Sequence, residues 1–219
     1  MNLRHFSILL AIAAPTLGAA QTLSIWDAAY RLEADAHSGQ SNDSQLSFNN
    51  NVGPQQSFFD RVDAFASDLP SSAHSWSTVG WNCTPTTLDV ELTACWDSVD
   101  FGAGNSAHML SQLYLGINLD TTNFISIASA FDLPNSWAEI DIWNGNSWIL
   151  LVNRNQIQSY SNFWGPGDYR LRAERHYDPV GNSTGCVPWS FHMDAQAVPE
   201  PATIIALGAG LAVLLRRRR

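Results

Sequence analysis

The chain has 219 residues, of which only 14% are charged and nine are tryptophan. Its eleven basic residues are all arginines, and five of them lie in the terminal segments, at position 4 and at positions 216–219. Between residues 21 and 198, six arginines therefore face nineteen acidic residues, which gives a formal charge of −13. A surface this acidic repels phosphate groups, so the composition argues against a nucleic-acid partner. It is compatible with divalent cations or neutral glycans.

The first 20 residues have the layout of a secretory signal peptide. Arg4 supplies a positive region, residues 8–14 form a short apolar stretch, and residues 18–20 are all small. A membrane-spanning helix needs about 20 residues, so this apolar stretch is too short to cross a bilayer. We therefore expect export, with cleavage after Ala20. The alternative is a buried N-terminal helix.

The middle of the chain, residues 21–197, is predicted to be one domain built from strands. Clusters of Ser, Asn, Asp, Gly and Pro separate runs that are rich in β-branched and aromatic residues. A polar loop is expected at 35–43. The run 58–69 fits a helical stripe or a strand, and we favour a strand because no capping residue precedes it. The other predicted strands are 23–30, 75–82, 87–95, 112–119, 124–131, 169–176 and 189–198.

A hairpin over residues 137–152 is the element with the strongest pattern. Trp137, Glu139 and Asp141 occupy one face of its first strand, and apolar residues occupy the other. Asn-Gly-Asn at 144–146 is a tight-turn sequence, and 148–152 is the returning strand. Strands at this spacing, without a long amphipathic helix, predict an all-β fold, an antiparallel β-sandwich that is jelly-roll-like in broad terms.

Three cysteines lie outside the terminal segments, and export to an oxidising compartment permits disulfides. Cys83 and Cys95 flank residues 84–94, and each lies beside a strand-like run. We favour a disulfide between these two, which would clip a hairpin and contribute about 3 kcal/mol. Cys186 would then be free or joined to another chain.

The sequence contains no convincing catalytic or metal-binding motif. Residues 181–185 match G-x-S-x-G, but Pro188 would stop the helix that a nucleophile elbow needs. The histidines are dispersed and show no i, i+4 pair for zinc, so we expect no metal and no cofactor. Acid pairs such as Glu139 with Asp141 are common on outer sheet faces without catalysis, although a glycosidase does need two carboxylates. Asp and Asn residues in the loops could still bind calcium through their side-chain oxygens.

Aromatic residues are the most suggestive candidates for ligand contact. Trp143 and Trp148 lie in the predicted hairpin, and Trp164 lies beside a Gly-Pro loop. Exposed indole rings give flat platforms for sugar rings, so we consider these three tryptophans as glycan contacts. The alternative is core packing, which a sandwich also requires of large side chains.

The C-terminus combines three features. The sequence Val198, Pro199, Glu200, Pro201 is followed by the uncharged stretch 202–215 and then by Arg216, Arg217, Arg218 and Arg219. As a helix, fourteen residues reach about 21 Å, somewhat short of a hydrocarbon core of about 30 Å. Basic residues beside a membrane segment stay in the cytoplasm, so residues 21–198 would lie outside the cell. An ordinary, unprocessed tail anchor is the alternative.

This combination closely resembles the PEP-CTERM sorting domain. The resemblance covers about the last twenty residues and implies recognition by an exosortase, a membrane-embedded cysteine transpeptidase of Gram-negative bacteria that make extracellular polysaccharide. It also implies a transient inner-membrane helix and cleavage near Pro199-Glu200-Pro201. The close of the domain, from 165 to 173 and on into 198, also resembles the sandwiches of many PEP-CTERM proteins.

We therefore expect an exported protein of the cell surface or extracellular matrix that has a structural or interaction role and is not an enzyme. A carbohydrate-binding module acting on extracellular polysaccharide is the first alternative. A secreted hydrolase is the second.

Overall fold

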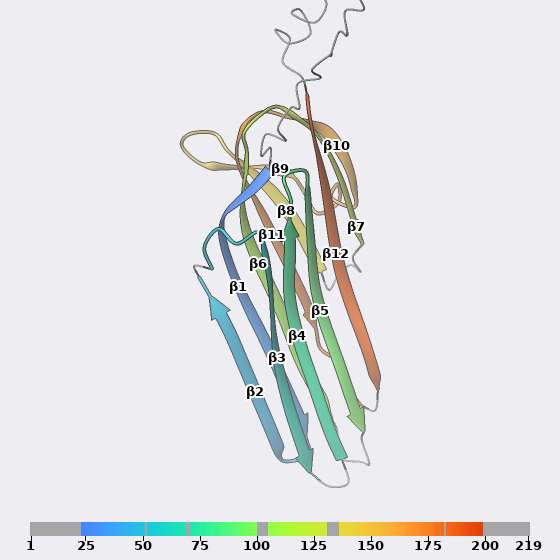
Figure 1. Cartoon of the computed structure of the whole chain (residues 1–219). Helices are drawn as coiled ribbons and strands as arrows, with labels where there is room; N and C mark the ends of the chain where they lie inside the picture. The colour runs from blue at the N-terminus through green and yellow to red at the C-terminus, as the bar shows by residue number, and fades with distance from the viewer. Residues whose placement is uncertain are drawn as a thin grey trace, which may run out of the picture.

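The computed structural model describes residues 23–50, 52–68, 71–99, 105–130, 136–181 and 183–198. These residues form twelve strands: β1 (Leu23–Ser38), β2 (Ser41–Asn49), β3 (Ser57–Asp68), β4 (Ser71–Cys83), β5 (Thr87–Val99), β6 (Ser106–Leu119), β7 (Asn123–Ala130), β8 (Ser136–Trp143), β9 (Trp148–Val152), β10 (Ser159–Trp164), β11 (Gly167–Tyr177) and β12 (Thr184–Ala197). The strands make two six-stranded antiparallel sheets (Figure 1). Sheet A has the order β2-β1-β6-β11-β8-β9, and sheet B has the order β10-β7-β12-β5-β4-β3.

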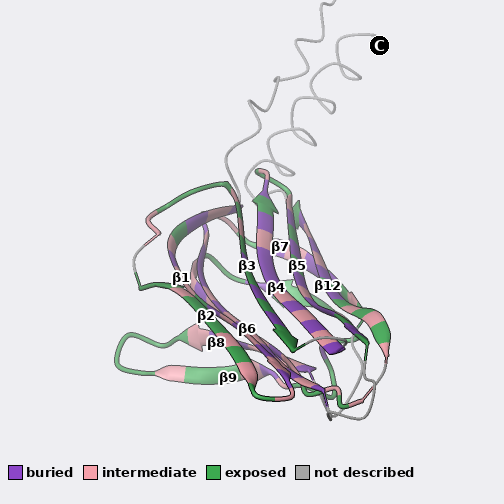
Figure 2. Ribbon diagram, turned by 90° about the horizontal axis from the view of Figure 1, so that it is seen from below, coloured by how far each residue is buried: buried purple, intermediate pink, exposed green. Residues whose placement is uncertain are grey.

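The two sheets pack face to face because side chains alternate between the two sides of each strand. In β11, for example, Tyr169, Leu171 and Ala173 are buried, whereas the intervening arginines lie on the outer face. Figure 2 shows the same alternation as buried and more exposed bands along the strands of both layers. The prediction of an all-β fold with antiparallel sheets, consistent with a β-sandwich, is confirmed.

The connections between strands cross repeatedly from one sheet to the other. From β5 to β8 the chain changes sheet at every connection, and it does so again from β9 to β12. The last strand, β12, lies between β5 and β7. The jelly-roll likeness stays a prediction, with which these crossings agree.

Most predicted strands exist and are longer than expected, but the polar loop at 35–43 is wrong. β1 continues to Ser38 and β2 begins at Ser41, so the connection is a two-residue turn with Gly39 at a φ of 58°. The sequence pattern missed β2 and β10, both of which lie at sheet edges. An edge strand with few buried residues lacks the apolar alternation that identifies a strand.

The ambiguous run 58–69 is β3 for the part that the structure describes, so the preference for a strand is confirmed. The hairpin of β8 and β9 is also confirmed. Ala138 and Ile140 are buried between the sheets, and Trp137 and Glu139 lie on the opposite face.

The core between the sheets has one large and one small cluster of buried side chains. Trp189, Tyr169 and Phe191 are the largest apolar side chains of the main cluster that are fully buried. The smaller cluster lies at the end of the sandwich where β6 begins, and it contains Trp96. Trp96 stacks on Tyr177 with ring centroids 4.5 Å apart. This stack joins β5 of sheet B to β11 of sheet A.

The cysteine pairing differs from the prediction. Cys95 is bonded to Cys186, and Cys83 is a buried free cysteine. The reason is register: Cys83 pairs with Leu88 at the turn of the β4–β5 hairpin, seven positions along β5 from Cys95, which corresponds to about 24 Å. Cys186 lies directly opposite Cys95 on β12, with Cα atoms 4.1 Å apart.

Three predicted features lie outside the described residues: the signal peptide at 1–20, the helix at 202–215 and the arginines at 216–219. Within the described part of the chain, no helix has the length and apolarity that crossing a bilayer requires.

Candidate functional site

The outer face of sheet A carries a groove with a volume of about 540 Å³. One row of residues crosses the groove in register, from β2 through β1, β6 and β11 to β8: Phe48, Arg31, Gln112, Glu174 and Trp137. Adjacent strands lie about 4.8 Å apart, so this row extends over roughly 19 Å. The groove is therefore long and open rather than a deep, closed pocket.

Aromatic and apolar side chains form the two ends of the groove. Phe48 and Leu46 on β2 are 61% and 55% exposed, although both are apolar. Trp137 lies at the other end, with the guanidinium of Arg154 5.7 Å from its ring centroid. Tyr114, on β6, lines the middle. Exposed apolar surface of this kind, next to polar groups, is typical of ligand-binding grooves.

Polar side chains between the aromatic ends are already paired with one another. Gln112 Nε2 donates to Glu174 Oε2 at 2.8 Å. Arg172 donates to Asp141 Oδ2 at 2.9 Å and to Glu139 Oε2 at 3.1 Å. These bonds fix the side chains before any ligand arrives, which lowers the entropic cost of binding.

Two of the three predicted glycan contacts lie on this face. Trp143 and Trp148 face each other across the β8–β9 hairpin with ring centroids 5.4 Å apart, and Trp143 is 40% exposed. Arg170 lies over Trp148 at 4.6 Å. Both tryptophans lie beside the groove and do not line it.

The prediction that Trp164 contacts a glycan is wrong, because Trp164 does not lie on the surface. It is 3% exposed and stacks on Tyr169 with ring centroids 4.6 Å apart, inside the core. Its position on β10 directs the ring between the sheets, so no sugar ring can stack on it. The alternation of an edge strand with so few residues was too weak to show this from the sequence.

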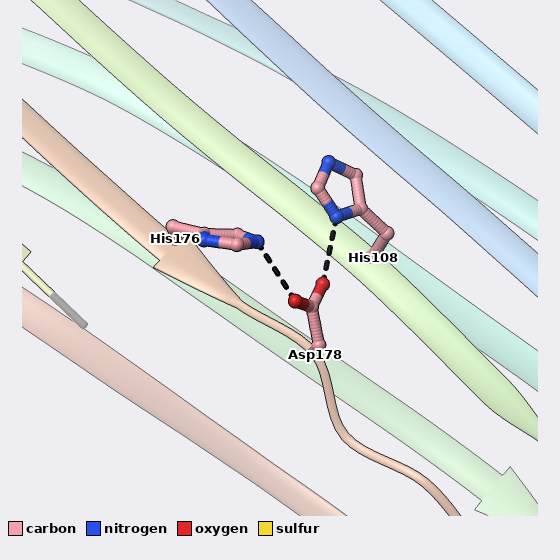
Figure 3. Close-up of side chains that lie close together, drawn as sticks. All are labelled: His108, His176 and Asp178. Atoms are coloured by element: carbon pink, nitrogen blue, oxygen red, sulfur yellow. Dashed lines mark hydrogen bonds and ion pairs between the residues drawn. The ribbon is translucent and has the colours of Figure 1, made fainter. Parts of the chain in front are cut away.

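A cluster of two histidines and one aspartate lies near one end of the same outer face (Figure 3). His108 Nδ1 lies 2.7 Å from Asp178 Oδ1, and His176 Nε2 lies 2.8 Å from Asp178 Oδ2. Figure 3 shows the carboxylate between the two rings. Ligand atoms of the three residues all lie within 4.8 Å of one another. Glu33 Oε2 lies 3.5 Å from His108 Nε2.

The fold brings this cluster together from distant parts of the chain. His108 is on β6, His176 is on the neighbouring strand β11, and Asp178 follows β11 immediately. Tyr177 packs inward on Trp96, so its two neighbours in the sequence point outward. The histidines are dispersed along the sequence, and only the β6–β11 register places His108 and His176 side by side, so no local sequence pattern predicts the cluster.

The outer face of sheet B has a depression of about 550 Å³ around Gly80. Phe59, Glu91, Asp89 and His192 line it. Asp89 and Glu91, two residues apart on β5, therefore lie on one face. His192 Nδ1 lies 2.6 Å from Asp89 Oδ1, and this hydrogen bond raises the pKa of His192.

The G-x-S-x-G sequence adopts none of the geometry of a nucleophile elbow in the residues that the structure describes. Ser183 is followed at once by strand β12, and its Oγ accepts a hydrogen bond from Trp96 Nε1 at 2.9 Å. A nucleophile elbow requires a helix after the serine.

The sorting sequence begins where the sandwich ends. The N–H of Val198 donates to the carbonyl of Thr122 at 2.9 Å, directly after β12. Val198 is the last described residue, and Pro199, Glu200 and Pro201 lie outside the described residues.

Residues 197–219 match the family described as the PEP-CTERM protein-sorting motif. The predicted resemblance is therefore confirmed over the C-terminal segment. This motif marks an exported protein that is sorted through the membrane as a target of an exosortase. Comparisons with curated proteins and with solved structures find no match to the chain.

Proposed function

We propose that the protein is a cell-surface or extracellular-matrix protein of a Gram-negative bacterium with a structural or interaction role and no enzymatic activity. The observation that carries this proposal is the sorting motif at 197–219, placed immediately after the last strand of the sandwich. An exosortase acting beyond Val198 would release the sandwich without removing any of its strands. The Cys95–Cys186 disulfide also fits an exported protein.

The proposed route has an inner-membrane intermediate. Residues 1–20 direct export, the apolar stretch 202–215 stays in the membrane, and the arginines at 216–219 stay in the cytoplasm. The sandwich then lies outside the cytoplasm until cleavage near Pro199-Glu200-Pro201.

The test compares cells with and without the cognate sorting enzyme. With the enzyme, we expect a mature protein whose mass lacks residues 202–219; without it, the uncut chain stays in the membrane fraction. Glu200→Ala should block processing, whereas Gln196→Ala, an exposed change on β12 just before the motif, should not. A mature species that retains residues 202–219 would contradict the proposal.

A second candidate function, carbohydrate binding, is favoured by the groove on sheet A. A sugar ring has an apolar face and a rim of hydroxyl groups, and this groove offers aromatic rings at Phe48, Tyr114 and Trp137 together with polar groups at Gln112 and Glu174. Because acidic residues outnumber arginines nineteen to six between residues 21 and 198, a neutral or weakly charged polysaccharide suits the groove better than a strongly anionic one.

Glycan-array binding by the full chain tests this candidate. Trp137→Ala should weaken binding about tenfold, because a stacked ring contributes about 1.4 kcal/mol. Trp143→Ala and Trp148→Ala should weaken it less, since these rings lie beside the groove. Trp76→Ala, on the outer face of sheet B, is the matched control and should leave binding unchanged. Equal binding by Trp137→Ala and the wild type would remove this candidate.

A further inference from the structure

We propose that His108, His176 and Asp178 form a binding site for a divalent transition-metal ion of the zinc type. This inference does not rest on the proposed function, because it concerns a different part of sheet A and needs neither sorting nor a glycan. Two imidazole nitrogens and one carboxylate oxygen are the donor set that zinc accepts in sites that keep an open position. All three ligand atoms already lie within 4.8 Å of one another.

The three donor atoms lie close to the spacing that a zinc ion requires. Zn²⁺ binds nitrogen and oxygen ligands at about 2.0–2.2 Å, so donor atoms around it lie roughly 3–3.5 Å apart. His108 Nδ1 and His176 Nε2 both approach the same carboxylate, at 2.7 Å and 2.8 Å from its two oxygens. Figure 3 shows both rings directed at Asp178 from adjacent strands. Side-chain rotations alone would open this arrangement around an ion.

His176 has a ring nitrogen that an ion would satisfy. Its Nε2 atom is shielded from solvent and makes no hydrogen bond of good geometry, although it lies at ion-pair distance from Asp178 Oδ2. A shielded ring nitrogen without such a bond is costly, since burial removes its hydrogen bond to water. Coordination to an ion between the nitrogen and the carboxylate would satisfy it.

A further carboxylate supports His108 from the other side of its ring. Glu33 Oε2 lies 3.5 Å from His108 Nε2, on the side of the ring opposite to Asp178. A metal-bound histidine commonly donates its second ring N–H to a carboxylate, which fixes the ring and its tautomer. Glu33 is therefore the positioning residue that leaves Nδ1 of His108 available to the ion.

The backbone also holds the ligands in place. The N–H of Ala107 donates to the Pro179 carbonyl at 3.1 Å, and the N–H of Gly181 donates to the Asn105 carbonyl at 2.8 Å. These two bonds tie the segment that follows Asp178 to the start of β6, beside His108. The surrounding acidic surface further favours a cation.

Titration of the EDTA-stripped full chain, purified in detergent, with Zn²⁺ by calorimetry tests the site. We expect one Zn²⁺ per chain. His108→Ala, His176→Ala and Asp178→Asn should each weaken binding about tenfold or more, and Glu33→Gln should weaken it about tenfold. His192→Ala is the matched control, because His192 also lies between two carboxylates, those of Asp89 and Asp194, and its removal should change nothing.

Thermal unfolding gives a second readout. Zn²⁺ should raise the Tm of the wild type and of His192→Ala, but not that of Asp178→Asn, which keeps the shape of the side chain and the fold. Circular dichroism identifies any variant that is unfolded. If one is, the result with the isosteric Asp178→Asn decides whether the proposal stands. The proposal is overturned if Zn²⁺ does not bind, or if it binds equally to the wild type and to Asp178→Asn.

Discussion

Asp141 lies on the outer face of β8, yet it is only 3% exposed because Arg170 and Arg172 close over it. Arg170 Nε donates to its Oδ2 at 2.7 Å, and Arg172 donates to both of its oxygens. The Asp141 carboxylate therefore fixes the positions of both guanidinium groups at the groove on sheet A.

Replacing this carboxylate by an amide should be costly. We expect Asp141→Asn to lower the free energy of unfolding by about 1.5–3 kcal/mol, because hydrogen bonds to charged partners are lost while the guanidinium groups stay partly buried. Urea unfolding of the full chain measures this. Asp120→Asn, at an exposed aspartate outside these ion pairs, should change it by no more than about 0.5 kcal/mol, and an equal effect of the two would contradict the argument.

His192 makes the stability of sheet B depend on pH. The hydrogen bond to Asp89 raises its pKa above the ordinary value of 6.5, with Asp194 adding to the effect. A raised pKa in the folded state means that the stabilisation is complete below about pH 6.5 and is lost as the pH rises through the folded-state value. His192→Gln should therefore be less stable than the wild type at about pH 5 and closer to it at about pH 9. A difference between the two proteins that does not vary with pH would refute this.

Elements of the fold depend on a few glycines that give space to aromatic rings. Gly185 is the second residue of β12 and lies opposite Trp96, and a Cβ added there would lie 2.7 Å from the indole ring. Trp96 is held in place by its stack on Tyr177 and its hydrogen bond to Ser183. The ring therefore cannot yield easily.

Gly185→Ala should destabilise the protein by about 1–3 kcal/mol, the usual cost of overpacking. The matched control is Gly165→Ala, where an added Cβ meets nothing within 4 Å and where φ is not positive. Denaturant unfolding followed by tryptophan fluorescence compares the two. If both substitutions cost the same, the contact with Trp96 is not the cause.

The strands differ in how well the sequence could predict them. The β8–β9 hairpin was predictable because its apolar alternation and its turn residues agree, whereas the edge strands β2 and β10 bury little and leave no such pattern. For the sites, the sequence pointed to Trp143 and Trp148, whose glycan contact stays a prediction. It did not indicate the groove, since Phe48, Gln112 and Trp137 come from three strands whose register no local pattern encodes. His108 and His176 were missed for the same reason.

At the scale of the whole molecule, the Cys95–Cys186 disulfide joins strands that are 91 residues apart in the sequence. A loop this long should contribute about 4–5 kcal/mol, so the double change Cys95→Ser with Cys186→Ser should lower the free energy of unfolding by about that amount. Urea unfolding of the two proteins measures the difference.

Thiol labelling checks the pairing itself. Burial raises the pKa of the Cys83 thiol to about 11, so we expect it to resist alkylation in the folded chain and to react after unfolding without reductant. Peptide mapping of the unreduced protein should then find Cys95 linked to Cys186. A peptide that joins Cys83 to Cys95 would contradict the structure.

The chain enters and leaves the sandwich at one end: Leu23 pairs with Leu119, and Val198 bonds to Thr122 just beyond. The histidine–aspartate cluster lies near the other end of β6, roughly 35–40 Å away. In a molecule tethered to a bilayer through its C-terminus, the histidine–aspartate cluster would thus lie near the end of the sandwich away from the tether, and the groove would lie on the outer face of sheet A. Cleavage of the C-terminal segment would free the molecule to move away from the bilayer, but it would leave the side chains of the cluster unchanged.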